Sequence, residues 1–171
     1  DQEIKKVLKL IEELYNYGTD GVIVQDLGAA KLIQDSFPDL ELHASTQLTV
    51  HNVDGAKFLE SLGFSRVVLA REMSLEEIEA VVAETELKVE TFIHGALCIS
   101  YSGQCLMSSL IGGRSGNRGR CAQPCRLLYT LVNLDTKEVI DSKLVKENLL
   151  SPKDINTIEI LPQLIKAGID S

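Results

Sequence analysis

The hydrophobic pattern of the first 90 residues alternates between two periods. Apolar residues at positions 4, 7, 8, 11 and 14 recur at the spacing of one helix face, and Gly18 ends this predicted helix. Short apolar runs predict buried strands at residues 21–25, 40–44, 66–70 and 87–92. Amphipathic stretches predict helices at residues 27–36, 53–62 and 74–85, the last opened by a Ser-x-x-Glu capping box.

This alternation predicts an α/β fold whose strands run parallel. The regular spacing of the strands favours part of a TIM-like (β/α) barrel. An open, doubly wound sheet is the alternative. No Gly-x-Gly-x-x-Gly follows the first strand, which disfavours a dinucleotide-binding site.

One local pattern, a helix followed by glycine, two or three residues and a strand, occurs at Gly18, Gly63 and Gly168. The third copy, at residues 167–171, stops where its strand should begin, and no strand precedes the first helix. We therefore expect the chain to be a fragment of one longer barrel domain. The exposed sheet edges of such a fragment favour self-association.

The pattern changes after residue 93. The fragment is expected to hold βα units at 1–93, a loop segment rich in cysteine, glycine and arginine at 94–126, and a β-hairpin with a C-terminal helix at 127–171. The hairpin turn is predicted at residues 133–136. A short helix is expected to open at 151–154 because a proline stands at its first turn, and a last helix is expected over 158–166.

Charge changes the picture of possible partners. The net charge of −8 argues against nucleic acid for the chain as a whole. Residues 94–130, however, hold four arginines and all four cysteines without any Asp or Glu, so the average charge does not exclude an RNA partner. The chain lacks the apolar runs of a membrane span and of a signal peptide, and we expect a soluble, cytoplasmic protein with no membrane partner.

The cysteines are spaced Cys98-x6-Cys105-x15-Cys121-x3-Cys125. Free buried thiols, disulfides and a metal site are the three interpretations, and close clustering favours the metal site. Zinc is the less favoured metal because neither pair forms the usual Cys-x2-Cys knuckle. Wide, unequal spacing among glycines and arginines suits an iron–sulfur cluster better.

Residues 90–108 read Glu-Thr-Phe-Ile-His-Gly-Ala-Leu-Cys-Ile-Ser-Tyr-Ser-Gly-Gln-Cys-Leu-Met-Ser. This stretch resembles the signature of peptidase family U32, the collagenase-like proteases, at every fixed position. Similar family segments occur at residues 24–28, 43–47, 70–72, 112–126 and 150–154. The resemblance therefore covers nearly the whole chain.

The resemblance implies a barrel-like catalytic domain and two lines of chemistry. The family is named for proteolysis of collagen, without agreed catalytic residues. Better-understood relatives carry a [4Fe-4S] cluster and serve hydroxylation of a tRNA wobble uridine, of ribosomal RNA or of a ubiquinone precursor. Cys98, Cys105 and Cys121 match the cluster ligands of these relatives, and Cys125 is the only local candidate for the fourth.

The candidate catalytic residues are polar groups at or beside the carboxyl ends of the predicted strands, where barrel enzymes gather their active groups. They are Glu90, His43 and Glu72, with Gln25, Asp26, Thr46 and Gln47 as weaker members. A Cys98–His94 pair would suit a peptidase only on a helix, which the sequence does not indicate there. A His-Glu-x-x-His zinc motif is absent.

Arg114, Arg118 and Arg120 lie among glycines and are candidates for an anion site, with a solvated loop as the alternative. Three functions stay open. The first is a U32 peptidase acting on a peptide, and the second is a [4Fe-4S]-dependent protein that hydroxylates RNA or a ubiquinone precursor. The third is an inactive, metal-free fragment.

Overall fold

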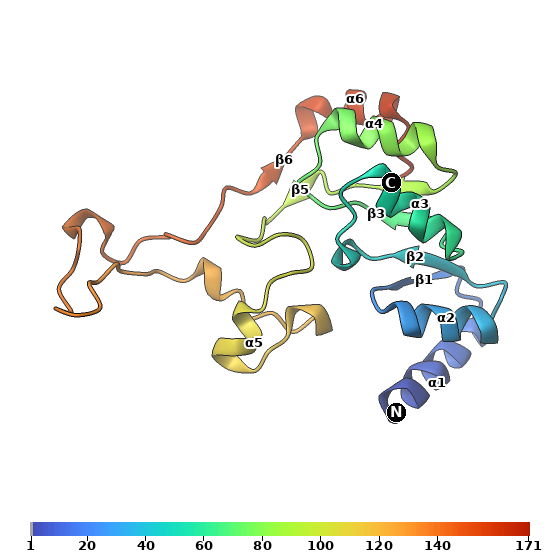
Figure 1. The fold of residues 1–171 in the computed structure, drawn as a ribbon, viewed down its shortest axis with the longest axis horizontal. Coiled ribbons are helices and arrows are strands. Elements are labelled where there is room, and N and C mark those ends of the chain that lie inside the picture. Colours follow the sequence, from blue (N-terminus) through green and yellow to red (C-terminus); the bar gives the residue numbers. More distant parts are fainter. Residues whose placement is uncertain (1) are drawn as a thin grey trace. The chain divides into compact units, whose positions relative to one another are not determined.

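The structure is a computed structural model that describes residues 2–171. The chain divides into two compact units (Figure 1). Residues up to Ile93 together with Thr157–Ser171 form the sheet unit, and His94–Asn156 form the cysteine unit. No helix within the described residues is long and apolar enough to cross a membrane.

Over residues 2–93 and 157–171, the sheet unit contains four strands and five α-helices. Its strands are β1 (Gly21–Val24), β2 (Glu41–Ala44), β3 (Arg66–Val68) and β4 (Lys88–Glu90). Its helices are α1 (Gln2–Asn16), α2 (Leu27–Ser36), α3 (Val53–Ser61), α4 (Leu75–Glu84) and α6 (Leu161–Ala167), with 3₁₀ turns at Thr46–Leu48 and Ile158–Ile160. These bounds confirm the strands and helices expected in the first 90 residues to within a few positions.

The four strands are all parallel and lie in the order β1-β2-β3-β4. Helices adjacent in the series pack on one another, α1 on α2, α3 on α4 and α4 on α6. Sequential order without reversal is that of a (β/α) barrel, whereas a doubly wound sheet reverses its strand order at a switch point. The α/β fold with a parallel sheet is therefore confirmed. The four strands form an open sheet rather than a closed barrel.

Side-chain caps explain why three of the helices begin where they do. Asp26 accepts a hydrogen bond from Ala29 N (2.7 Å) at the start of α2, and Asn52 accepts one from Gly55 N (2.8 Å) at the start of α3. Ser74 opens α4 in the predicted capping box. Each cap satisfies an amide that the helix itself leaves unpaired.

The repeated glycine pattern also has a structural cause. Gly18, Gly63 and Gly168 adopt φ values of 81°, 86° and 94°, the left-handed conformation that ends a helix. After Gly168 the chain reaches the edge of the sheet, because Asp170 N donates to Val89 O at 2.8 Å. The residues after Gly168 therefore lead from a helix to the sheet, as the residues after Gly18 and Gly63 do.

The core lies between the sheet and its helices. Strand side chains such as Leu42, Val67 and Val89 are almost completely buried there. Residues that alternate with them lie on the other side of the sheet, called here the open face, which carries the polar side chains of the five residues Glu41, His43, Arg66, Lys88 and Glu90. One face of the sheet thus packs against the helices, and the other carries most of the charged strand residues, together with Val68 and Ile23.

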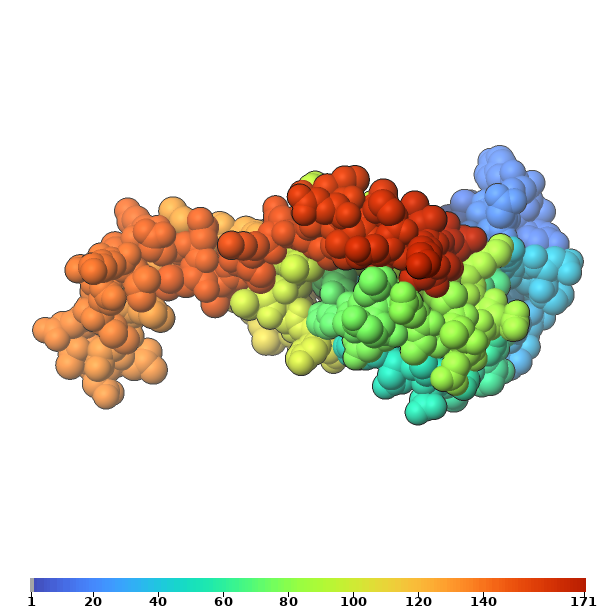
Figure 2. All heavy atoms as spheres, turned by 90° about the horizontal axis from the view of Figure 1, so that it is seen from above, coloured from blue at the N-terminus to red at the C-terminus, as the bar shows by residue number. Residues whose placement is uncertain are grey.

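The cysteine unit is built differently. It contains β5 (His94–Gly95) paired antiparallel with β6 (Ile155–Asn156), α5 (Met107–Gly112), and 3₁₀ turns at Gly116–Arg118, Pro124–Arg126 and Ser142–Leu144. Its only fully buried residues are Ser102, Ser108 and Pro124. Figure 2 shows its orange residues as a narrow strip. Hydrogen bonds rather than an apolar core define this unit.

The predicted hairpin at 127–141 is confirmed in part. Residues 134–136 form a turn, Val132 makes an antiparallel bridge with Val139, and Asn133 N donates to Glu138 O at 2.9 Å. Its arms make isolated bridges rather than strands, because their exposed side chains provide no face to bury. The expectation for the segment that follows was wrong. Residues 151–154 open no helix, and the chain runs from there into β6. The last helix is confirmed as a 3₁₀ turn at Ile158–Ile160 that continues into α6.

Candidate functional site

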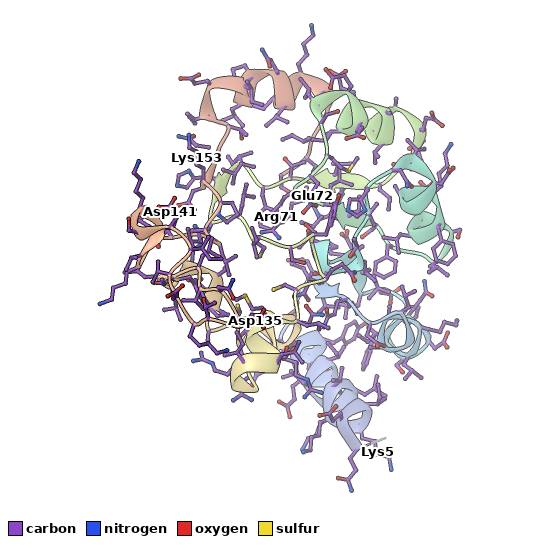
Figure 3. All side chains as sticks on the ribbon, turned by 60° about the vertical axis from the view of Figure 1, so that its left-hand side comes forward. Lys5, Arg71, Glu72, Asp135, Asp141 and Lys153 are labelled. Carbon is purple, nitrogen blue, oxygen red and sulfur yellow. The ribbon has the colours of Figure 1, made fainter. Side chains whose placement is uncertain are left out.

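The carboxyl edge of the parallel sheet brings together side chains from several loops of the sheet unit. His51 lies in the loop between β2 and α3, and Glu72 lies in the turn after β3, labelled in Figure 3. His51 Nε2 is 3.8 Å from Glu72 Oε2, and the two side chains are 35% and 31% exposed. A carboxylate at this edge is therefore held beside an imidazole while it stays open to solvent.

The same edge carries an aromatic ring and a guanidinium group. Arg71 precedes Glu72 in the turn after β3, and its Cζ lies 5.8 Å from the centroid of the Phe92 ring, within the range of a cation–π contact. Phe92 is 43% exposed. Thr46 Oγ1 donates to Leu69 O (3.2 Å) and ties the loop after β2 to the strand that leads into this turn.

His43 does not lie with this group. Its Nε2 is 3.1 Å from Glu41 Oε2, and a Cβ on Gly21 would meet the same nitrogen at 3.0 Å. The imidazole therefore turns back along the open face toward the amino ends of the strands. The expectation that His43 serves the carboxyl edge is corrected, since alternation along β2 and the pairing with Glu41 direct the ring the other way.

Glu41 is surrounded by groups that favour its charged form. The pKa of its carboxyl lies below the ordinary value, chiefly because of the hydrogen bond with His43, with further contributions from Lys88 and from the Ser65 hydroxyl. Lys88 Nζ is 3.6 Å from Glu41 Oε1, and Ser65 Oγ donates to Oε2 at 3.2 Å. This group stabilises the amino half of the open face.

Glu90, the foremost candidate from the sequence, lies in a second ionic group on the open face. Its Oε2 is 4.0 Å from Arg66 Nη1 and accepts a hydrogen bond from Ser171 Oγ (3.4 Å). Arg66 also pairs with Asp170 and hydrogen-bonds Ser171. Glu90 is thus the last residue of β4 and contacts Arg66 and Ser171, while Glu72 lies in the turn after β3, beside His51. Asp26 caps α2 as described above.

Three residues of this edge, His51, Arg71 and Phe92, were not selected from the sequence. Arg71 and Phe92 lie inside segments that resemble the family pattern, but in these segments the sequence favoured the acidic residues Glu72 and Glu90. His51 could have been found from its place in the loop between a predicted strand and the next helix, because such loops lie at the carboxyl edge. Its pairing with Glu72 has no sequence signal.

The four cysteines all belong to the cysteine unit and are free thiols. Cys98 and Cys121 are exposed, and Cys105 and Cys125 are half-buried. Gln123 N donates to Cys121 Sγ at 3.3 Å. Across residues 2–171, no three His, Cys, Asp or Glu side chains come together as metal ligands.

The four cysteines nevertheless provide the type of ligand, and the number of ligands, that a cluster held by four thiolates requires. None of the four cysteines is in a disulfide, they share one unit, and they lie on loops with few buried contacts. The loops would have to draw them closer to hold one cluster. His94 lies in β5 and residues 94–98 contain no helix, so the helical Cys98–His94 pair that a peptidase would need is not formed.

Arg114, Arg118 and Arg120 are exposed on one loop of the cysteine unit. The loop is folded by Arg114 Nε, which donates to Arg120 O at 3.0 Å, and by Arg120 N, which donates to Ser115 O at 3.0 Å. Three cationic side chains are thus gathered within one short turn that is open to solvent.

Arg126 has a different role from these three. It donates to Leu97 O (3.0 Å), Pro152 O (3.1 Å) and Asp154 Oδ1 (3.0 Å). Its guanidinium therefore fastens the two ends of the cysteine unit together.

Comparison with known proteins gives a family and several relatives. A family model described as Peptidase family U32 matches residues 1–171. The chain is 46% identical over 171 residues to the 23S rRNA 5-hydroxycytidine C2501 synthase of Escherichia coli K12, covering 100% of this chain and 25% of that protein.

Two further relatives carry different names. Over 155 residues the chain is 39% identical to tRNA hydroxylation protein P1 of Bacillus subtilis, covering 88% of this chain and 36% of the relative. Over 171 residues it is 36% identical to the uncharacterized protease MJ0090 of Methanocaldococcus jannaschii, covering 97% and 41%. The chain thus spans from a quarter to about two fifths of the length of these relatives.

Proposed function

We propose that this chain, which belongs to peptidase family U32, is part of an enzyme that hydroxylates a pyrimidine of ribosomal or transfer RNA. The observation that carries the proposal is the 46% identity, over all 171 residues, to a relative named as an rRNA 5-hydroxycytidine synthase. A tRNA hydroxylation protein matches 88% of the chain. The matched region spans the arginine loop and the four cysteines as well as the sheet.

The arginine loop supports an RNA partner on physical grounds. Arg114, Arg118 and Arg120 are exposed, and guanidinium groups bind phosphate oxygens in pairs of hydrogen bonds. Each phosphate contact releases counterions, so binding through this loop should weaken steeply with added salt. The cytoplasm, where ribosomal and transfer RNA are found, is the location that goes with this function.

Cys98, Cys105, Cys121 and Cys125 are the residues that would hold an iron–sulfur cluster in the full-length protein. Such a cluster supplies one-electron redox chemistry when bound. Zinc is the less favoured occupant because the spacing lacks a Cys-x2-Cys knuckle. The cysteine unit contributes the thiols, and Arg126 joins the two ends of this unit through its bonds to Leu97 O and Pro152 O.

Peptidase activity has weaker support. One relative is named as an uncharacterized protease, at 36% identity. The Cys98–His94 arrangement expected for a thiol peptidase would need a helix, and residues 94–98 have none. Hydroxylation of a ubiquinone precursor has no observation in its favour, and a peptide substrate and self-association stay predictions.

The test compares RNA nucleosides from cells with and without the gene for the full-length protein. Digested rRNA and tRNA are analysed by mass spectrometry for a pyrimidine that has gained one oxygen atom. We expect this nucleoside to disappear on deletion and to return with the wild-type gene. An unchanged nucleoside profile, together with hydrolysis of gelatin by the purified protein, would favour the peptidase instead.

A matched pair of triple variants connects this test to the structure. Replacing Arg114, Arg118 and Arg120 by Ala should weaken RNA binding at low salt and flatten its salt dependence. Replacing Lys137, Lys143 and Lys146 by Ala removes the same charge from exposed positions later in the cysteine unit. We expect this control to bind RNA as the wild type does.

A further inference from the structure

The carboxyl edge of the sheet has the composition of a binding site for a flat, polar ligand. Three loops contribute to it: His51 comes from the loop before α3, Arg71 and Glu72 from the turn after β3, and Phe92 from the chain after β4. Loops at the carboxyl ends of parallel strands are where α/β enzymes bind their ligands. None of these four residues is a cysteine-unit residue or part of the arginine loop.

Phe92 and Arg71 together form a stacking surface. The Phe92 ring remains 43% exposed although Arg71 lies 5.8 Å from its centroid. An aromatic ring and a guanidinium plane are the two surfaces on which proteins stack unpaired RNA bases.

Glu72 adds a hydrogen-bond acceptor beside this surface. An ionised carboxylate only accepts hydrogen bonds, and a pyrimidine offers it the N4 amine of cytosine or the N3–H of uracil. His51 Nε2 lies 3.8 Å from Glu72 Oε2 and has no solvent-exposed surface of its own. A base could therefore reach Glu72 but not this nitrogen.

We propose that Phe92, Arg71 and Glu72 bind a single unstacked pyrimidine base of the RNA, with Phe92 and Arg71 stacking on it and Glu72 accepting from its Watson–Crick edge. This inference rests on the proposed RNA function and assigns the base to the sheet unit. The arginine loop of the cysteine unit is left to contact the phosphate backbone. Arg71 adds a positive charge that favours any nucleotide.

The test uses the full-length protein and a single-stranded RNA that carries one 5-iodouridine, a photoreactive base that cross-links to stacked aromatic side chains. Fluorescence anisotropy first measures whether this RNA binds. After irradiation, tandem mass spectrometry locates the cross-linked residue. We expect Phe92 to carry the cross-link, and Phe92→Leu to lower its yield about tenfold, as loss of one stacking contact predicts.

Two variants make this result specific. Phe58→Leu removes a ring that is 56% exposed on α3, outside the carboxyl edge, and it should leave cross-linking unchanged. Glu72→Gln keeps the size of the side chain and should weaken RNA binding several-fold, because the carboxylate charge that strengthens the hydrogen bond is lost.

The outcomes separate this inference from the proposed function. Bound RNA that cross-links only to residues 94–130, for example to the exposed Tyr101, would overturn the base site and leave the RNA function standing. Equal yields for wild type and Phe92→Leu would overturn it as well. An RNA that does not bind at any salt concentration would overturn both.

Discussion

Arg66 and Asp170 form an ion pair on the open face of the sheet, with Nη2 and Oδ2 2.5 Å apart. The Arg66 side chain is only 13% exposed, and its Nε is buried without a hydrogen-bond partner. Asp170 also bonds to β4 through its backbone. This pair fastens the last described residues to the third strand.

Asp170→Asn should lower the free energy of unfolding by about 1–2 kcal/mol, because a largely buried guanidinium loses its nearest carboxylate. Urea unfolding followed by circular dichroism measures the change. Asp35→Asn is the control, since it breaks the well-exposed Lys31–Asp35 pair on α2 and should cost less than about 0.5 kcal/mol. Equal losses in the two variants would contradict the structural role of Asp170.

Gly18 and Gly168 both end helices with positive φ, so replacing each by Ala separates the cost of backbone strain from the cost of a steric clash. Gly18→Ala should cost about 1 kcal/mol, because φ is +81° and a Cβ there meets no other atom. Gly168→Ala should cost more, since its φ is +94° and the new Cβ would lie 2.8 Å from Val82 Cγ1. Thermal unfolding of both variants measures the difference. The expectation fails if Gly18→Ala is the more harmful change.

The depressed pKa of Glu41 makes one part of the folded state sensitive to acid. Its carboxylate is favoured in the folded chain by His43, Lys88 and Ser65. The stabilisation is complete above the ordinary pKa of 4.5 and is lost as the pH falls through the lower pKa of the folded state. A carbon NMR titration should place the Glu41 midpoint below 4.5, and His43→Leu should raise it because His43 is the largest cause. A midpoint that does not move would count against this geometry.

The cysteine unit should be the first part of the chain to be cut by trypsin. It buries no large apolar side chain within 94–156, and Arg114 and Arg118 are exposed, so local opening costs little free energy. Mass spectrometry of the early fragments identifies the sites.

Iron and sulfide should slow this cleavage if the proposed cluster forms, because metal binding stabilises the folded form of its ligands. A chelator should restore the fast rate. Cys98→Ser and Cys121→Ser should remove the protection, and Ser100→Ala, a change of similar size in the same loop, should not. Protection that survives the cysteine changes would argue against these ligands.

The sheet unit could be predicted from sequence because its signals are local. Ser74 with Glu77 specifies the start of α4, Gly63 specifies the end of α3, and two-sided apolar runs specify parallel strands. Each signal acts within a few residues, so chain position alone is enough to place it.

The candidate site depended on contacts between distant residues, which the sequence does not display. Glu90 was predicted from its place after a strand, and that place does not reveal its contacts with Arg66 and Ser171. His51 and Glu72 meet only because β2 and β3 are neighbours. In the cysteine unit, the six-residue helix α5 has no side-chain cap and was not predicted.

The pairing of β5 with β6 joins the first and last residues of the cysteine unit, since His94 stands opposite Asn156. The chain therefore departs from the sheet unit and rejoins it at one point, where Thr157 N donates to Ile93 O. When the two ends of a segment are held together, the entropic cost of closing the loop rises only slowly as the segment becomes longer. Residues 94–156 can therefore change in length and sequence at little cost to the stability of the sheet unit, whose strands have to preserve their own packing.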